Sequence, residues 1–542
     1  MRAVQGEVLE ITLTTEEALP AGLMAVLATT LNTPGGKTWG EVPFVKANAK
    51  SLSCHVTPRH PGMHSLRATF SLDDGSTWVG DTVPDAFVLI DPPQVDGLRI
   101  YTLIPTVSGN LEDWAADLTR IAAMGFNAIH LLPITALDTT ESPYAANDLF
   151  DIDQSYLTPG SRKDDFKQLQ DYVANAKDHG IRLCFDLVLN HIGVHSKMAR
   201  RAPDWIVPDP NQADGLKRAR YWTSGGWRAW NDLALINYEH PSEATRAEIW
   251  AYMKDYVMFW ASFAKETGGF VRFDNLHSSN SAFVRSLTRG IQSDIPEVAV
   301  LAEYFTDEST LLDSVPLWGL NLILATPWNY KFVPELREYL NYIHRVSEQI
   351  RYFMPITSHD SGSPDQEFGT ADSTVPRYVA AALMGTGATG MPEGVECGEL
   401  RRIDFIGRQA RRSFDAKPRF AEFVRCVNSI LVNHPAFRRG QNCQFVDGGH
   451  PSILAALRTN AEGGTPGYLV VCNFDIHSAQ SITIDLTSVL GPDGPFRAHE
   501  LLGGEIKVFT QARFDLQLPP CGAWVLEFFG PRPLHVSSAP SP

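Results

Sequence analysis

Three features are missing from the sequence: a long apolar run, a cluster of basic residues and a C-x-x-C pair. A membrane-spanning helix needs about 20 consecutive apolar residues, so no such helix is expected. The 46 Lys and Arg residues are outnumbered by 62 Asp and Glu residues, and the formal charge of −16 repels nucleic acid and anionic membrane surfaces. These absences argue against a nucleic-acid or membrane partner and favour a neutral substrate.

Cysteine is scarce as well, with seven residues that are odd in number and scattered along the chain. Cys184 and Cys472 lie inside apolar strand patterns, where cysteine usually serves as a small buried hydrophobic side chain. The N-terminus has no basic start followed by an apolar stretch, so a secretion leader is not expected. We therefore expect a cytoplasmic protein, whose oligomeric state the sequence leaves open, with a homodimer among the alternatives.

The chain of 542 residues is too long for one compact core, and its hydrophobic content of 44% provides material for several domains. Residues 1–96 carry short alternating segments punctuated by Gly, Pro and Asp, which predicts an N-terminal β-sandwich. Residues 441–532 return to this alternation and predict a C-terminal β-sandwich, followed by a disordered tail at 533–542.

Between the sandwiches, residues 97–440 alternate short apolar strands with amphipathic helices, which is typical of parallel βα units. Eight such units predict an α/β fold built on a (β/α)8 TIM barrel. The largest insertion, about residues 192–240, follows the third strand and predicts a small inserted domain. The predicted strands are RIYTLIP, AIHLLP, IRLCFDLVLN, GGFVRFDN, VAVLAEY, LNLILAT, FMPITSHD and GATGMPEG.

Polar side chains gather at the C-terminal ends of several predicted strands, the rim where TIM barrels hold their active sites. A solvated turn would explain any one of them, but not the convergence of the whole set on one rim. The set comprises Asp186, Asn190 and His191 from the third strand, Arg272, Asp274 and His277 from the fourth, Glu303 from the fifth, and His359 and Asp360 from the seventh.

The segments that carry this set resemble a known family. FDLVLNH, GFVRFDNLH, LAEYF and TSHD look like the four ordered signature segments of the α-amylase family, glycoside hydrolase family 13. The stretch SPYAANDLFDID resembles the family's tyrosine-bearing loop after the second strand. The resemblance covers about residues 97–530 and implies a retaining enzyme that cleaves α-glucosidic bonds of malto-oligosaccharides or glycogen-like glucans.

Retention requires two carboxyl groups about 5 Å apart, one to attack the anomeric carbon and one to protonate the leaving oxygen. The resemblance assigns these roles to Asp274 and Glu303. Arg272, two residues before the nucleophile on the same strand face, is expected to lower the pKa of Asp274 and keep it ionised. Apolar neighbours are expected to raise the pKa of Glu303 so that it carries the proton.

The remaining positions follow from the resemblance. Asp360 is the third catalytic carboxylate and accepts hydrogen bonds from sugar hydroxyls, while Tyr144 stacks on the sugar beside the nucleophile. The expected substrate-binding residues are Tyr144, His191, Arg272, His277 and His359, and the expected supporting residues are Asp186 and Asn190.

Within the family, the position of His277, three residues after the nucleophile, is similar to glycogen debranching glucanotransferase domains and to the maltosyltransferase that uses maltose 1-phosphate. ATPWNYKFVPELREYL and GTGATGMPEGVECGEL also resemble that maltosyltransferase, and HIGVHSKMARRAPDW resembles the debranching enzyme. The maltosyltransferase group, however, lacks the Asn190–His191 and His359–Asp360 pairs that this chain has. We therefore expect a general α-glucan-active enzyme first and a glucan or maltosyl transferase second.

Three further points stay open. A calcium ion near Asn190 occurs in many relatives, but its other ligands cannot be identified here, so no cofactor or metal is assigned. Trp222, Trp227 and Trp230 either stack on sugar rings or form the core of the insertion. A non-catalytic glycan-binding relative is a minor alternative, because such relatives usually lose a catalytic carboxylate.

Overall fold

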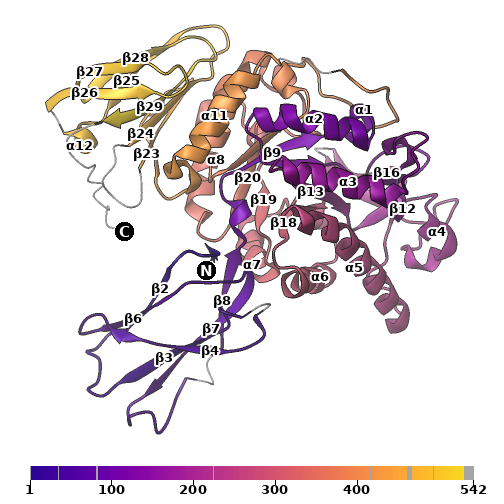
Figure 1. Cartoon of the computed structure of the whole chain (residues 1–542), viewed down its shortest axis with the longest axis horizontal. Helices are drawn as coiled ribbons and strands as arrows, with labels where there is room; N and C mark the ends of the chain where they lie inside the picture. The colour runs from indigo at the N-terminus through magenta and orange to yellow at the C-terminus, as the bar shows by residue number, and fades with distance from the viewer. Residues whose placement is uncertain are drawn as a thin grey trace.

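The structure is a computed structural model that describes residues 2–529 except 34–35, 81–83, 224, 414–417, 460–466 and 492. A closed barrel of eight parallel strands forms its centre, with a β-rich domain at each end of the chain, so the predicted fold class is confirmed. Figure 1 shows the N-terminal domain in indigo below the barrel and the C-terminal domain in yellow to one side. The predicted tail at 533–542 lies outside the described residues.

Each of the eight predicted strand segments overlaps one barrel strand. The strand interiors are buried on both faces, because helices cover the outside and side chains fill the inside, which explains their continuous apolar runs. In barrel order the strands are β9 (Leu98–Leu103), β10 (Ala128–Leu131), β13 (Arg182–Val188), β17 (Phe270–Asp274), β18 (Ala299–Ala302), β19 (Leu322–Leu324), β20 (Tyr352–Pro355) and β21 (Ala388–Pro392).

Eight helices form the outer layer of the barrel, one after each strand. Most begin at a side-chain cap; α2, for example, has Asn110 in a capping box with Asp113. The helices are α2 (Leu111–Ala123), α3 (Asp165–Asp178), α5 (Glu243–Glu266), α6 (Ser281–Asp294), α7 (Glu308–Trp318), α8 (Val333–Val346), α10 (Thr374–Leu383) and α11 (Ala421–Asn433). No helix among the described residues is long and apolar enough to span a bilayer.

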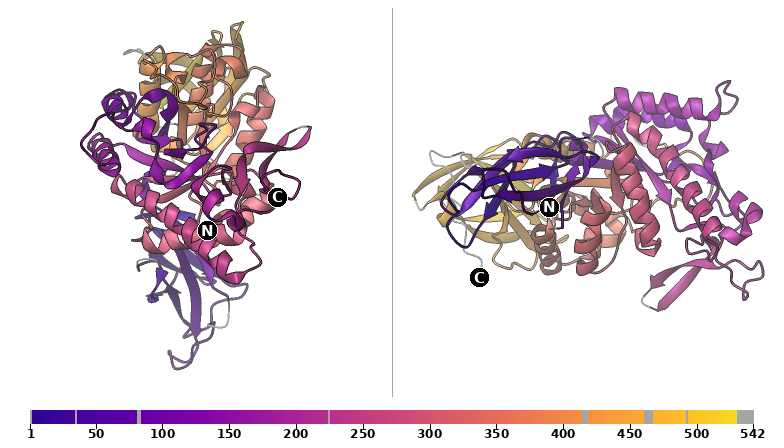
Figure 2. Two further views of the ribbon diagram at one scale, coloured as in Figure 1. Left: turned by 90° about the vertical axis from the view of Figure 1, so that its right-hand side faces the viewer. Right: turned by 90° about the horizontal axis from the view of Figure 1, so that it is seen from below.

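The insertion after β13 contains a three-stranded sheet in the order β14-β16-β15. Its strands are β14 (His191–Gly193), β15 (Arg218–Thr223) and β16 (Gly226–Leu235), with the short helix α4 (Lys197–Arg201) between the first two. Figure 2 shows the β15–β16 hairpin projecting from the barrel domain.

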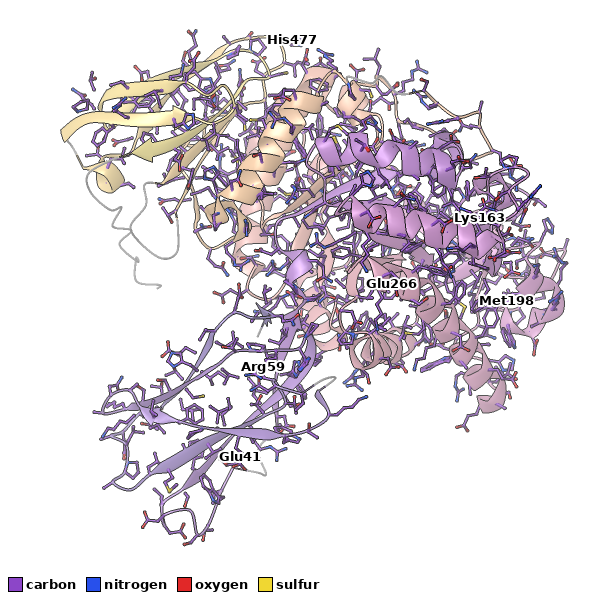
Figure 3. All side chains as sticks on the ribbon, in the orientation of Figure 1. Glu41, Arg59, Lys163, Met198, Glu266 and His477 are labelled. Carbon is purple, nitrogen blue, oxygen red and sulfur yellow. The ribbon has the colours of Figure 1, made fainter. Side chains whose placement is uncertain are left out.

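Both flanking domains consist of two antiparallel-rich sheets around their own cores. The N-terminal domain pairs β1-β8-β7-β3-β4 with β2-β6-β5, and the C-terminal domain pairs β22-β23-β24-β29-β26-β27 with β25-β28. In Figure 3, Glu41 and Arg59 mark the first domain and His477 the second. The seven cysteines of the chain are all free. The strand bounds are β1 (Arg2–Val4), β2 (Leu9–Thr14), β3 (Met24–Thr29), β4 (Gly40–Pro43), β5 (Val45–Lys46), β6 (Ser51–Val56), β7 (Gly62–Ser71), β8 (Ala86–Asp91), β22 (Cys443–Phe445), β23 (Ile453–Arg458), β24 (Tyr468–Asn473), β25 (Gln480–Asp485), β26 (Asp493–Glu500), β27 (Ile506–Gln511), β28 (Arg513–Leu518) and β29 (Ala523–Phe529).

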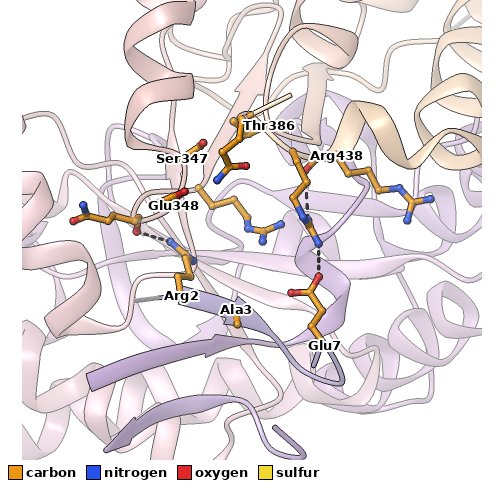
Figure 4. A pocket seen from close by; sticks show the side chains of 12 residues that line it. Arg2, Ala3, Glu7, Ser347, Glu348, Thr386 and Arg438 are labelled. Atoms are coloured by element: carbon orange, nitrogen blue, oxygen red, sulfur yellow. Dashed lines mark hydrogen bonds and ion pairs between the residues drawn. The ribbon is translucent and has the colours of Figure 1, made fainter. Parts of the chain in front are cut away.

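Ion pairs join the N-terminal domain to the end of the barrel opposite the catalytic rim. Asp91, at the end of β8, accepts hydrogen bonds from Arg2 Nε at 2.6 Å and from Asn321 Nδ2 at 2.9 Å. Nearby, Arg439 pairs with Glu7 across a cleft of about 540 Å³ (Figure 4). This end of a TIM barrel usually serves stability, so the contacts fasten the domain without touching the catalytic rim.

We expect Asp91→Asn to lower the free energy of unfolding by about 3–5 kcal/mol, because it leaves the buried guanidinium of Arg2 without its counter-charge. The Asp91 side chain is 0% exposed and that of Arg2 is 4% exposed. Urea denaturation would measure the loss. Asp171→Asn, which removes an exposed ion pair with Lys163 and Lys167, is the matched control and should change stability little. Equal stabilities of the two variants would contradict the prediction.

Candidate active site

Side-chain alternation along the barrel strands carries charged groups into the barrel interior. In β17, Val271 and Phe273 pack outward against the helices, whereas Phe270 belongs to the interior core. Arg272 and Asp274 share the inward face of Phe270, because successive side chains of a strand point to opposite faces. Along β17, Phe270 is therefore the last apolar side chain of the interior core. The charged layer, which begins with Arg272 and Asp274, follows it toward the C-terminal end of the strand.

One guanidinium holds three carboxylates together in this layer. Arg272 Nη1 donates to Asp186 Oδ1 and to Asp274 Oδ1, both at 2.8 Å. Its Nη2 donates to Glu303 Oε2 at 2.7 Å. Since Nη1 and Nη2 share one carbon, the bonded oxygens of Asp274 and Glu303 lie no more than roughly 8 Å apart.

Arg272 lowers the pKa of Asp274 as expected, but the net shift of that pKa is upward. Burial raises the pKa of Asp274 well above its ordinary value; the charge of Arg272 lowers it, but Glu303, Asp186 and Asp360 raise it further. Sequence reasoning paired one arginine with one aspartate, whereas the structure divides that positive charge among three carboxylates. Arg272 therefore offsets only part of the effect of burial and of the neighbouring carboxylates on Asp274.

A backbone amide also fixes Glu303. Asn275, directly after Asp274, adopts a left-handed conformation with φ of 45°, which asparagine tolerates better than most residues. Its N–H donates to Glu303 Oε2 at 2.9 Å, and the N–H of Leu276 donates to the carbonyl of Glu303 at 2.8 Å. The turn after β17 therefore positions the end of β18.

Asp186 is ionised at neutral pH, because its pKa is lowered. Burial opposes its ionisation, but the charge of Arg272 and a hydrogen bond from His130 lower its pKa to about 2. His130, on β10, was missed by sequence reasoning; its Nε2 lies 3.0 Å from Asp186 Oδ2 and its Nδ1 lies 3.2 Å from Thr102 Oγ1. The only indication of this residue in the sequence is a single histidine within the predicted strand AIHLLP.

Tyr144 and His359 form a second group on the rim. The Tyr144 hydroxyl donates to Asp186 Oδ2 at 3.0 Å and lies 2.6 Å from His359 Nε2, and the two rings stack with centroids 5.8 Å apart. His359 Nε2 also lies 3.0 Å from Asp360 Oδ2. Crowding by the surrounding protein opposes ionisation of Asp360, yet His359 and Arg272 lower its pKa overall. Asp360 is therefore an ionised hydrogen-bond acceptor.

His191 presents an unused ring nitrogen. Its Nδ1 lies 2.6 Å from Asn190 Oδ1, which accepts and so fixes the proton on Nδ1. Its buried Nε2 has no partner among the described residues, and burial lowers the pKa of His191 to about 4, so this nitrogen is an acceptor at neutral pH. Asn190 thus orients His191.

Within the described residues, no group of three or more His, Cys, Asp or Glu side chains is placed to hold a metal ion.

A cleft of about 630 Å³ opens above these groups. Six of the ten predicted site residues line it, while Arg272, Asp186, His359 and Asn190 lie behind them and hold them in place. The six are Tyr144, His191, Asp274, His277, Glu303 and Asp360.

The inserted hairpin and a long loop after β21 complete the walls of the cleft. From the hairpin come Tyr221 and Trp230, whose rings stack with centroids 4.5 Å apart, and Trp227, which is 62% exposed. The loop contributes Phe405 and Ile406. The side chain of the third predicted tryptophan, at position 222, lies outside the description. Loop residues of this kind were not predicted, because no periodicity marks them.

Comparison with known proteins finds relatives of the kinds that the motifs resemble. Residues 92–209 match the family described as glycogen debranching enzyme, glucanotransferase domain. The α-1,4-glucan:maltose-1-phosphate maltosyltransferase of Picrophilus torridus is 24% identical over 422 residues, which cover 72% of this chain and 63% of that protein. The enzyme of the same name from Salinibacter ruber is 25% identical over 473 residues, covering 80% and 68%. The chain thus spans 63% and 68% of the length of these two curated relatives.

Solved structures share the fold at low sequence identity. The maltogenic α-amylase AmyB of Thermotoga neapolitana has a TM-score of 0.64 at 16% identity, covering 80% of this chain and 98% of that one. A cyclomaltodextrinase has a TM-score of 0.62 at 16% identity, covering 96% and 97%. The barrel fold is thus shared with these structures. The resemblance to the α-amylase family, glycoside hydrolase family 13, is confirmed, including its similarity to debranching and maltosyltransferase sequences.

Proposed function

We propose that the protein is a retaining enzyme that cleaves α-glucosidic bonds of malto-oligosaccharides or glycogen-like glucans by double displacement. The observation that carries this proposal is the binding of Asp274 and Glu303 to one guanidinium at the floor of an open cleft. Two carboxyl groups at short range across a sugar-sized space are what retention requires.

In the first step, Asp274 attacks the anomeric carbon while Glu303 protonates the departing glycosidic oxygen. The reaction needs one proton on the pair, located on Glu303, and an ionised carboxylate on Asp274, which Arg272 Nη1 stabilises at 2.8 Å. In the second step, Glu303 removes a proton from the incoming water or sugar hydroxyl, which releases the covalent glycosyl group from Asp274.

The other lining residues bind the sugar. The free Nε2 of His191 accepts a sugar hydroxyl, and the ionised Asp360 accepts others as positive charge develops on the ring. Tyr144 and His277 line the cleft and contact the ring. Arg272, Asp186, His359 and Asn190 position these groups through the hydrogen bonds described above.

Glucan or maltosyl transfer is the second candidate. The names of the curated relatives favour it, and so does the hairpin that brings Tyr221, Trp227 and Trp230 to the cleft. An aromatic wall of this kind holds an acceptor sugar where water would otherwise attack. We further propose a cytoplasmic location, because the seven cysteines are free thiols.

Incubation of the purified protein with maltoheptaose, with and without maltose 1-phosphate, separates the candidates. Shorter products with a net gain of reducing ends indicate hydrolysis, and longer products without such a gain indicate glucan transfer. Inorganic phosphate released only from the phosphorylated donor indicates maltosyl transfer. We expect the released anomeric centres to be α by NMR in every case, since the mechanism retains configuration. No change in any glucan, or β products, would overturn the proposal.

A further inference from the structure

A second cleft of about 860 Å³ lies between α7 and α8, beside the catalytic one. Its size is within the range of about 300–1,000 Å³ that is typical of ligand sites. We call it the tyrosine groove and define it by Tyr330, Tyr339, Tyr342, Asn329, Glu335 and Glu338, all of which line it. The catalytic scheme above uses none of these residues.

Three tyrosines form a row of nearly parallel rings along the groove. Tyr330 and Tyr339 stack with centroids 4.2 Å apart and an interplanar angle of 21°, and Tyr342 continues the row 6.4 Å beyond at 22°. All three rings are partly exposed. The Tyr339 hydroxyl accepts the N–H of Thr326 at 2.9 Å, which fixes that ring in place. The row is therefore a rigid aromatic surface open to solvent.

Three polar side chains of the groove, those of Glu335, Glu338 and Asn329, have no partner among the described residues. Glu335 and Glu338 are exposed, and within the described residues neither has an ion pair or a hydrogen bond from its side chain; the same holds for the amide of Asn329. No Lys, Arg or His is among the described residues that line the groove.

The cation at the edge of the groove is Arg345, which lies 5.6 Å from the Tyr342 ring centroid and already pairs with Glu308 at 2.8 Å. With that pair neutralised, Glu335 and Glu338 leave the groove negative, which disfavours an anionic ligand. A neutral, hydroxyl-rich ligand would find aromatic faces for its C–H groups and acceptors for its hydroxyls.

The groove is continuous with the catalytic cleft. Phe305, two residues after Glu303, lines both of them and is 41% exposed. A sugar chain that passes over this ring leaves one cleft and enters the other. If these tyrosines only filled the space between α7 and α8, we would expect them to be buried. Instead, their rings are partly exposed and lie beside carboxylates that have no partner among the described residues.

We propose that the tyrosine groove binds a stretch of neutral α-glucan chain continuing from the catalytic cleft, so that the enzyme prefers long glucans to short oligosaccharides. This inference rests on the proposed function, because it takes the same class of substrate. It adds a binding surface outside the catalytic cleft and names the residues that form it.

Electrophoresis through gels with and without glycogen tests the groove independently of catalysis. On the inactive Asp274→Asn background, the additional change Tyr330→Ala is expected to weaken glycogen retardation about tenfold, the scale of one lost aromatic stacking contact. Glu335→Ala combined with Glu338→Ala removes only exposed side chains and should weaken it without affecting the fold. Tyr252→Ala, a half-buried tyrosine on α5 outside both clefts, is the matched control.

Kinetics on active protein provide the second readout. Both groove variants should raise KM for glycogen about tenfold and leave kcat/KM for maltotetraose within about twofold. Glycogen retardation that is unchanged in both variants, or that falls equally in the Tyr252→Ala control, would overturn the inference. If the wild-type protein cleaves no glucan, the proposed function fails, and the gels still decide whether the groove binds one.

Discussion

Asp274→Asn is expected to lower kcat on α-glucan by on the order of 10⁴-fold or more, because the amide cannot form the covalent glycosyl intermediate. Glu303→Gln should cause a comparable loss, since the two residues act as one unit. The measurement is initial rates on maltoheptaose at matched protein concentration. Asp313→Asn, an exposed aspartate on α7, is the control and should retain full activity.

A glycosyl donor with an activated leaving group distinguishes the nucleophile from the general acid. With α-glucosyl fluoride, whose leaving group needs no proton, Glu303→Gln should still form the glycosyl-enzyme, whereas Asp274→Asn should not. A small external anion such as azide should then restore turnover in each variant, with an α product for Glu303→Gln and a β product for Asp274→Asn. Exchanged product configurations would show that the two assignments are reversed. Full activity of both variants would overturn both assignments.

Glu393→Gln is expected to flatten the dependence of stability on pH. Glu393 follows β21 and is 3% exposed; its Oε2 accepts from Ile104 N–H at 2.9 Å and from the Ser108 hydroxyl at 2.7 Å. Its Oε1 has no partner among the described residues. Burial raises the pKa of Glu393 to about 8, although these two hydrogen bonds lower it. The folded protein therefore keeps this carboxyl protonated at neutral pH.

The sign follows from the linkage of protonation to folding. Between the unfolded pKa of 4.5 and the folded value of about 8, the folded state holds a proton that the unfolded state has lost. Stability contributed by this group is complete below pH 4.5 and declines as pH rises to about 8, by a total of about 5 kcal/mol. Urea denaturation across this range should show the decline in the wild type and a smaller one in Glu393→Gln. Glu348→Gln, at an exposed position, should behave like the wild type; equal slopes for all three proteins would contradict the prediction.

The barrel and the positions of its charged groups could be predicted from the sequence because both depend on local rules. Apolar runs of strand length marked all eight strands, and polar residues at their ends marked one rim. The division of Arg272 among three carboxylates could not be predicted, since it depends on how closely neighbouring strands bring their side chains. The upward net shift in the pKa of Asp274 could not be predicted either, because it depends first on burial and then on the neighbouring carboxylates.

Residues supplied by loops and by single strand positions escaped prediction for a different reason. His130 resembles an ordinary buried histidine until Asp186 is seen beside it. Phe405 reaches the cleft from a loop whose path no sequence period describes. The tyrosines at 339 and 342 are three apart on a helix, a spacing that more often marks a core face than a sugar-binding surface.

The left-handed turn at Asn275 makes the two proposed catalytic carboxylates mechanically dependent on each other. The residue that follows the proposed nucleophile in the chain donates its amide N–H to the proposed acid, so a shift of either strand alone would break that bond. Adjustment of this enzyme toward another substrate, whether by natural variation or in the laboratory, must therefore move both strand ends together or leave both where they are.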